Sequence, residues 1–137
     1  KMPNVEELLV YLKENNYKVA VASSSNIDHI ENNMEKIGLR KYIDKIASGQ
    51  EVSNGKPAPD VFLLAAERLG VKPENCLVLE DSKSGIKAGR ASGATVFMIP
   101  DMFKPDEECL EIANRILKNL GEVISILEEE NDKDFNR

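Results

Sequence analysis

Four short apolar runs, interleaved with segments of helical periodicity, constrain the fold of this 137-residue chain more than any other feature. The runs are too short for helices and suit buried β-strands. The segments between them place apolar residues three and four positions apart, as an amphipathic helix does. This alternation predicts βα units and a parallel sheet, and therefore an α/β fold. The predicted strands cover residues 17–22, 43–47, 76–79 and 94–99; the predicted helices cover residues 5–15, 25–37, 61–69 and 82–91.

The residues after Pro100 form a second, less regular region. Apolar spacing predicts one helix from about residue 108 to 117 and another from about 120 to 127. Almost every residue from 128 to 137 is polar, so we expect a charged, disordered tail there. Because no linker interrupts the pattern, residues 1–127 are expected to belong to one core domain.

Composition excludes several classes of function. The net charge is −6 and no basic block occurs, so nucleic acid is a poor candidate partner. No apolar run approaches the ~20 residues of a membrane span, and we expect no membrane partner. The two cysteines, Cys76 and Cys109, are far apart and lack a histidine cluster, so neither a disulfide framework nor a zinc site is indicated. A reducing cytoplasm is the expected compartment.

Three polar clusters follow the predicted strands: the serines at 23–25, the loop at 54–57, and Glu80-Asp81-Ser82. In an open parallel sheet ligands bind outside the carboxyl ends of the strands, so the clusters can converge on one crevice. Hydroxyls, a lysine and adjacent carboxylates are suited to a metal-bound phosphoryl group. The sequence therefore predicts a phosphoryl-binding site.

Each cluster also has a simpler interpretation. The serines favour a helix cap over a phosphate contact when they are considered alone. Lys56 alone is more often a solvated surface lysine. Glu80 and Asp81 are more specific, because two adjacent acids repel each other unless a positive group lies near them.

In their order and spacing the clusters resemble the haloacid dehalogenase-like hydrolases, especially the branch similar to β-phosphoglucomutase and small-molecule phosphatases. The resemblance extends from about residue 5 to residue 99, and the strings K-P-x-P-D-x-F and E-D-S-x-x-G-I-x-A-G carry most of it. They correspond to Lys56-Pro57-Ala58-Pro59-Asp60-Val61-Phe62 and to the stretch that begins at Glu80-Asp81-Ser82. The resemblance implies a three-layer, Rossmann-like core and a magnesium-dependent phosphatase or phosphoglucomutase-like enzyme acting on a small phosphorylated metabolite.

The resemblance also implies roles for individual residues. Ser23 matches the hydroxyl that hydrogen-bonds a phosphoryl oxygen, and Ser24 matches the neighbour whose backbone amide assists it. Lys56 matches the lysine that neutralises phosphoryl and nucleophile charge. Glu80 and Asp81 match the acids that hold Mg²⁺ directly or through water. Asp60 is expected to organise the turn at the start of its helix.

One part of the family pattern is not found where the family has it. Members begin with a strand ending in D-x-D, whose first aspartate is the nucleophile, followed by a helical cap. The string Asp132-Lys133-Asp134 has that spacing but lies in the charged tail rather than after a strand. We therefore expect the core to be incomplete, either as part of a longer protein or with a second chain supplying the central strand, and we expect these 137 residues alone to be inactive.

Two alternatives come from other classes. A receiver domain of two-component signalling also combines acids, a hydroxyl and a lysine, but in the order acids, hydroxyl, lysine rather than the order found here. A noncatalytic regulatory or scaffold protein that retains the phosphate pocket is the stronger alternative. The sequence does not identify the substrate or the group that accepts the phosphoryl.

Overall fold

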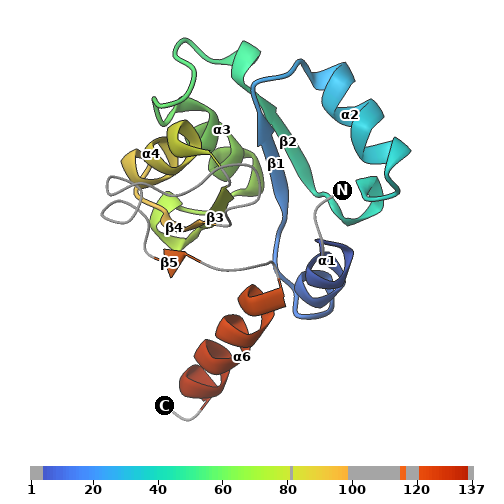
Figure 1. Ribbon diagram of the computed structural model, residues 1–137, viewed down its shortest axis with the longest axis vertical. Helices are drawn as coiled ribbons and strands as arrows, with labels where there is room; N and C mark the ends of the chain where they lie inside the picture. Colours follow the sequence, from blue (N-terminus) through green and yellow to red (C-terminus); the bar gives the residue numbers. More distant parts are fainter. Residues whose placement is uncertain (1–4, 81, 99–114, 117–120, 136–137) are drawn as a thin grey trace.

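The computed structural model describes residues 5–80, 82–98, 115–116 and 121–135. Strands and helices alternate through most of this range, so the predicted α/β class is confirmed (Figure 1). Three short 3₁₀ turns cover Arg40–Tyr42, Gly49–Glu51 and Pro73–Asn75. The helices are α1 (Val5–Glu14), α2 (Ile27–Lys36), α3 (Asp60–Leu69), α4 (Lys83–Ala91) and α6 (Gly121–Phe135). The strands are β1 (Ala20–Ser23), β2 (Lys45–Ser48), β3 (Leu77–Glu80), β4 (Thr95–Met98) and β5 (Arg115–Ile116).

All strand pairs are parallel, as the βα alternation predicted. The described strands form two sheets rather than one, with order β1-β2 in the first and β3-β4-β5 in the second. Ser23 pairs with Ser48 at the end of the first ladder, and Glu80 pairs with Met98 at the end of the second. Within the described residues, β1 and β3 therefore each have one edge without a strand partner.

Helices cover both faces of the β1-β2 pair. Leu9 of α1 and Ile30 of α2 pack with Ile46 on one face. Val61 and Ala65 of α3 pack against Ala47 on the other. This arrangement, visible in Figure 1, follows from the alternation of side chains along a strand, because Ile46 and Ala47 point to opposite faces.

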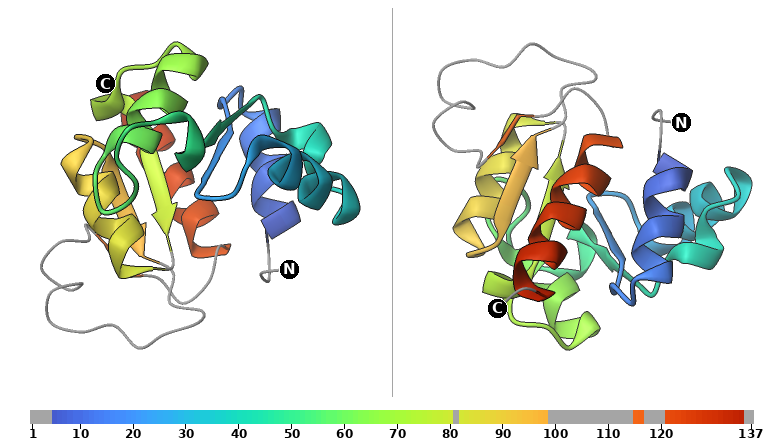
Figure 2. Two further views of the ribbon diagram at one scale, coloured as in Figure 1. Left: turned by 90° about the horizontal axis from the view of Figure 1, so that it is seen from above. Right: turned by 90° about the horizontal axis from the view of Figure 1, so that it is seen from below.

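The second sheet is sandwiched in the same way. Phe97 of β4 packs with Leu8 of α1 and Val123 of α6, and Leu77 and Leu79 of β3 lie against this cluster. Figure 2 shows α6 beside α1. On the opposite face, α4 lies directly on β3 and β4, where Gly89 approaches the side chains of their valines. Helices thus join the two sheets, whereas no strand ladder joins them within the described residues.

Several sequence-based expectations need correction. Helix α2 is capped by Asn26, whose Oδ1 accepts a hydrogen bond from His29 N at 2.8 Å, and not by Ser25. Arg115–Ile116 form β5, although that segment was predicted to end a helix; the rest of the predicted helix at 108–117 lies outside the described residues. Helix α6 continues to Phe135, so residues 128–135 of the expected disordered tail are helical. No helix in the described ranges is long and apolar enough to cross a membrane.

Candidate active site

Lys56 and Glu80 form an ion pair that joins the loop after β2, in the first sheet, to β3 of the second sheet. Lys56 lies in the loop between β2 and α3, and Glu80 is the last residue of β3. Lys56 Nζ lies 3.0 Å from Glu80 Oε2, and the two side chains are only 15% and 12% exposed. The structure therefore brings together two site residues that the sequence predicted from separate motifs.

The loop that carries Lys56 is held against the start of α3. Lys56 Nζ lies 4.9 Å from the centroid of the Phe62 ring, within the range of a cation–π contact. The carboxylate of Asp60 accepts hydrogen bonds from Asn54 N at 3.2 Å and from Asn54 Nδ2 at 3.3 Å. The expectation that Asp60 organises this turn is consistent with these contacts. Lys56 is thus fixed from two sides, by an aromatic face and by a carboxylate.

Ser82 links Glu80 to the start of α4. Its Oγ caps the helix by accepting a hydrogen bond from Gly85 N at 3.1 Å. The same hydroxyl donates to Glu80 Oε1 at 3.4 Å. Asp81, the second predicted metal ligand, lies outside the described residues, so its role stays a prediction.

The predicted phosphate-binding serines lie at the end of the other sheet. Ser23 is half-buried, and its Oγ accepts a hydrogen bond from Ser25 N at 3.2 Å. Ser24 is exposed. Within the described part of the chain, no hydrogen bond joins Ser23 or Ser24 to Lys56 or Glu80. The phosphate contacts assigned to these serines stay predictions.

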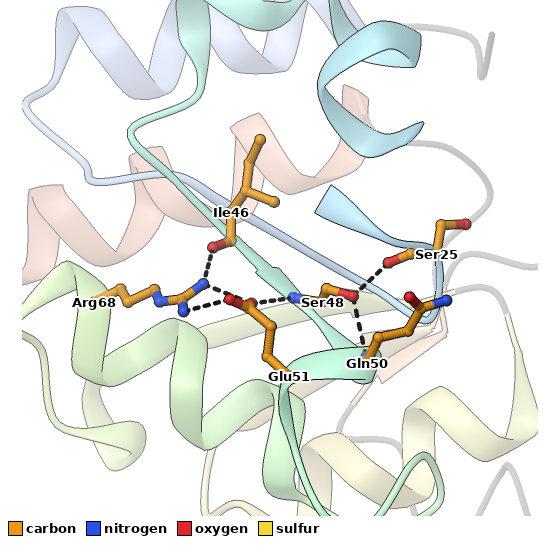
Figure 3. Close-up of polar contacts among 6 residues, drawn as sticks. All are labelled: Ser25, Ile46, Ser48, Gln50, Glu51 and Arg68. Atoms are coloured by element: carbon orange, nitrogen blue, oxygen red, sulfur yellow. Dashed lines mark hydrogen bonds and ion pairs between the residues drawn. The ribbon is translucent and has the colours of Figure 1, made fainter. Parts of the chain in front are cut away.

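A polar network at the end of β2 holds in place the loop of residues 23–25, which we call the serine loop (Figure 3). Ser48 is fully buried; its Oγ donates to Ser25 O at 2.5 Å and accepts from Gln50 N at 3.0 Å. Ser48 N in turn donates to Glu51 Oε2 at 3.0 Å, which completes a capping box. The loop after β1 is therefore hydrogen-bonded to the turn after β2.

Arg68 of α3 completes the network. Its guanidinium donates to both carboxylate oxygens of Glu51, at 2.8 and 2.7 Å, and to Ile46 O at 2.6 Å. The hydrogen bond from Arg68, followed by that from Ser48 N, lowers the pKa of Glu51 to about 2. Glu51 raises the pKa of Arg68 in return. The pair is permanently charged at neutral pH and ties α3 to the turn after β2.

Sequence reasoning missed this network. The spacing of Ser48 and Glu51 is the S-x-x-E pattern of a capping box and could have been recognised. Arg68 had no comparable signal, because its partners lie 17 and 22 positions away along the chain.

The described side chains do not by themselves make a metal site. No group of three or more His, Cys, Asp or Glu residues in the described ranges could hold a metal ion. Glu80 supplies a donor of the type that a hard cation such as Mg²⁺ prefers, a carboxylate oxygen. A metal site at Glu80 would need donors in addition to the His, Cys, Asp and Glu side chains of the described residues.

Comparisons with known proteins identify the family of the chain. Residues 1–99 match the haloacid dehalogenase-like hydrolase family. The chain is 34% identical over 128 residues to a phosphorylated carbohydrates phosphatase of Thermotoga maritima, covering 93% of this chain and 59% of that protein. A fructose-1-phosphate phosphatase of Escherichia coli is 44% identical over 75 residues, covering 55% of this chain and 40% of that protein.

Solved structures give the same result. A β-phosphoglucomutase from Clostridium difficile superposes with a TM-score of 0.81 at 28% identity, covering 99% of this chain and 58% of that one. The CbbY protein of Rhodobacter sphaeroides in complex with phosphate gives a TM-score of 0.80 at 30% identity, covering 89% of this chain and 55% of that one.

The chain spans less than two thirds of the length of these relatives. The family match covers most of the chain and includes the two motifs whose residues form the Lys56–Glu80 pair. The protein therefore belongs to the haloacid dehalogenase-like hydrolase family.

Proposed function

We propose that this chain contributes the phosphoryl-binding side of a phosphatase or phosphomutase that acts on a small phosphorylated metabolite. The Lys56–Glu80 pair carries the proposal. Removing two opposite charges from water costs free energy that their attraction does not always recover, so such a pair is weak evidence for stability. At the carboxyl edge of a parallel sheet it is better explained as a lysine held ready for an anionic ligand.

Each residue would act on the developing charge of the transferring phosphoryl group. The Lys56 ammonium would stabilise the equatorial oxygens, whose charge is greatest in the transition state. The hydroxyl of Ser23 and the backbone N–H of Ser24 would donate to the same group. Mg²⁺, held through Glu80 and Asp81, would supply further neutralisation of the phosphoryl oxygens.

We also propose that an added strand lies between β1 and β3 and carries the nucleophilic carboxylate that forms an aspartyl-phosphate. Both strands have an edge without a strand partner within the described residues, and α1 packs against both sheets. Exposed parallel edges leave backbone donors and acceptors unpaired, which favours strand addition. The strand would come from another segment of the same polypeptide or from a second chain.

The names of two relatives described above point to one substrate class. These two proteins are named as phosphatases of phosphorylated carbohydrates and of fructose 1-phosphate. A sugar phosphate is therefore the substrate class that we propose for this protein.

The test is hydrolysis of p-nitrophenyl phosphate with Mg²⁺ by the 137-residue chain, alone and with a separately made segment containing a strand that ends in D-x-D. We expect turnover only in the mixture. Lys56→Ala should lower kcat roughly 10²–10³-fold, as loss of one transition-state donor does elsewhere. The control Lys36→Ala, at an exposed lysine of α2, should leave kcat unchanged.

Two outcomes would contradict this proposal in different ways. Turnover by the chain alone that is lost on Lys56→Ala would place the nucleophile within these residues. Binding of inorganic phosphate at Lys56 without turnover in the mixture would favour the noncatalytic, phosphate-binding alternative.

A further inference from the structure

Two buried glycines of α4 lie against β3 and β4, but they meet different kinds of side chain. A methyl group on Gly85 would lie 2.0 Å from Cδ and 2.2 Å from Oε2 of Glu80. A methyl group on Gly89 would lie 2.7 Å from Cγ2 of Val96 and 3.2 Å from Cγ1 of Val78. Both approaches are shorter than van der Waals contact, so glycine is needed at each position for the observed packing.

The periodicities of the helix and the strand explain this correspondence. Gly85 and Gly89 are four residues apart and lie on one face of α4. Val78 and Glu80 are two residues apart and point to the same face of β3, whereas Leu77 and Leu79 pack into the opposite cluster. Glu80 therefore lies over Gly85, one helical turn from the place where Val78 lies over Gly89.

The space at Gly85 is filled by the part of Glu80 that makes the ion pair. Oε2, the oxygen that lies 3.0 Å from Lys56 Nζ, is also the atom that would be 2.2 Å from a methyl group on Gly85. A side chain at position 85 would therefore displace the carboxylate from Lys56. A glutamate has three side-chain torsions, so it can move without disturbing the backbone.

We propose that Gly85 is a positioning residue of the active site. Because glycine has no side chain, it leaves the space that the Glu80 carboxylate needs to contact Lys56. This inference rests on the proposed function for its importance to catalysis. Its structural part, the control of Glu80 by Gly85, can be tested without substrate.

The two glycines give a matched pair of variants with opposite expectations. In Gly85→Ala the clash is with the flexible end of a glutamate, and alanine favours the helix more than glycine does, so Tm should fall less than in Gly89→Ala even though the ion pair is broken. In Gly89→Ala the clash is with stiff β-branched side chains of the core, so Tm should fall. Lys56 should lose its partner in the first variant and keep it in the second.

The experiment measures acetylation of Lys56 by mass spectrometry in the 137-residue chain, with exposed Lys36 as the internal reference, and Tm by calorimetry. The rate at Lys56 relative to Lys36 should rise severalfold in Gly85→Ala and in Glu80→Ala, and should stay unchanged in Gly89→Ala. Because the proposed effect acts through Glu80, Gly85→Ala should add nothing further in the Glu80→Ala background.

Three outcomes would overturn the proposal. The acetylation rate of Lys56 could stay unchanged in Gly85→Ala, could rise equally in Gly89→Ala, or could rise further when Gly85→Ala is added to Glu80→Ala. Each of these results would show that Gly85 does not act by positioning the Glu80 carboxylate. The proposed function is tested separately by turnover of the strand-supplemented chain. If the acetylation rate of Lys56 responds as expected but Gly85→Ala loses no turnover, Gly85 positions Glu80 and the Lys56–Glu80 pair has no catalytic role.

Discussion

Two ion pairs lie near opposite ends of α3 and differ in geometry and surroundings. Lys56 and Glu80 meet through one contact, and both side chains are largely buried. Arg68 and Glu51 meet through two, and each side chain is about one third exposed. The second pair also holds two backbone groups, Ile46 O and Ser48 N, whereas the first is flanked by an aromatic ring and a hydroxyl. We infer that the Arg68–Glu51 pair stabilises the fold, and we propose that the Lys56–Glu80 pair binds the ligand.

Exchanging the two cations gives the largest expected contrast. Lys56→Arg should lower kcat of the strand-supplemented chain roughly 10²-fold, because a planar guanidinium cannot replace a point charge beside the phosphoryl group. Arg68→Lys should leave kcat nearly unchanged and lower Tm, because lysine cannot form the two-pronged contact with Glu51. Steady-state kinetics and calorimetry on both variants would separate the roles. Equal effects on kcat would show that the two pairs are not specialised.

Removal of the buried hydroxyl of Ser48 should have an intermediate effect. Ser48→Ala loses the cap at Gln50 N and leaves Ser25 O without its donor, which should cost about 1–2 kcal/mol of unfolding free energy. Urea denaturation would measure this loss, with Ser53→Ala at an exposed position as the control. If Ser48→Ala were as stable as its control, the network would not brace the serine loop.

The acid dependence of stability should show the smallest effect. The folded state lowers the pKa of Glu51 from 4.5 to about 2, so its contribution is complete above about pH 4.5 and is lost as the pH falls toward 2. Glu51→Gln should therefore flatten the decline of Tm across this window. The control Glu14→Gln, on the exposed side of α1, should leave the slope unchanged. A slope that is identical in all three proteins would mean that the Glu51 contact does not persist in solution.

The sequence predicted the repeating part of the fold well, because each strand and helix there has its own local pattern. The strands around Val21 and Val78 and the helix over residues 61–69 were all expected, and the structure ends that helix at Gly70, which is in the left-handed conformation. The sequence also placed Lys56 and Glu80 in one predicted site, and the structure brings their side chains together, although their role stays a prediction. It did not predict β5, because a two-residue strand lacks any period, and it placed the cap of α2 one residue too early.

The parts of the site that were missed depend on contacts between distant residues. Arg68 reads as an ordinary residue in the last turn of a helix until α3 is packed against β2. Gly85 reads as a poor helix former until Glu80 is placed over it. The metal role of Asp81 and the phosphate contacts of Ser23 and Ser24 stay predictions.

The packing of α6 on α1 has a consequence for the order of folding. The β1-β2 and β3-β4 ladders join strands that are close in sequence, so their loops close at low entropic cost and each ladder can form early. The cluster of Leu8, Phe97 and Val123 instead joins α1 and α6, from the two ends of the described chain, to β4. We expect this cluster to form last, so the final kinetic step of folding is the one that fixes the spacing of the two sheets.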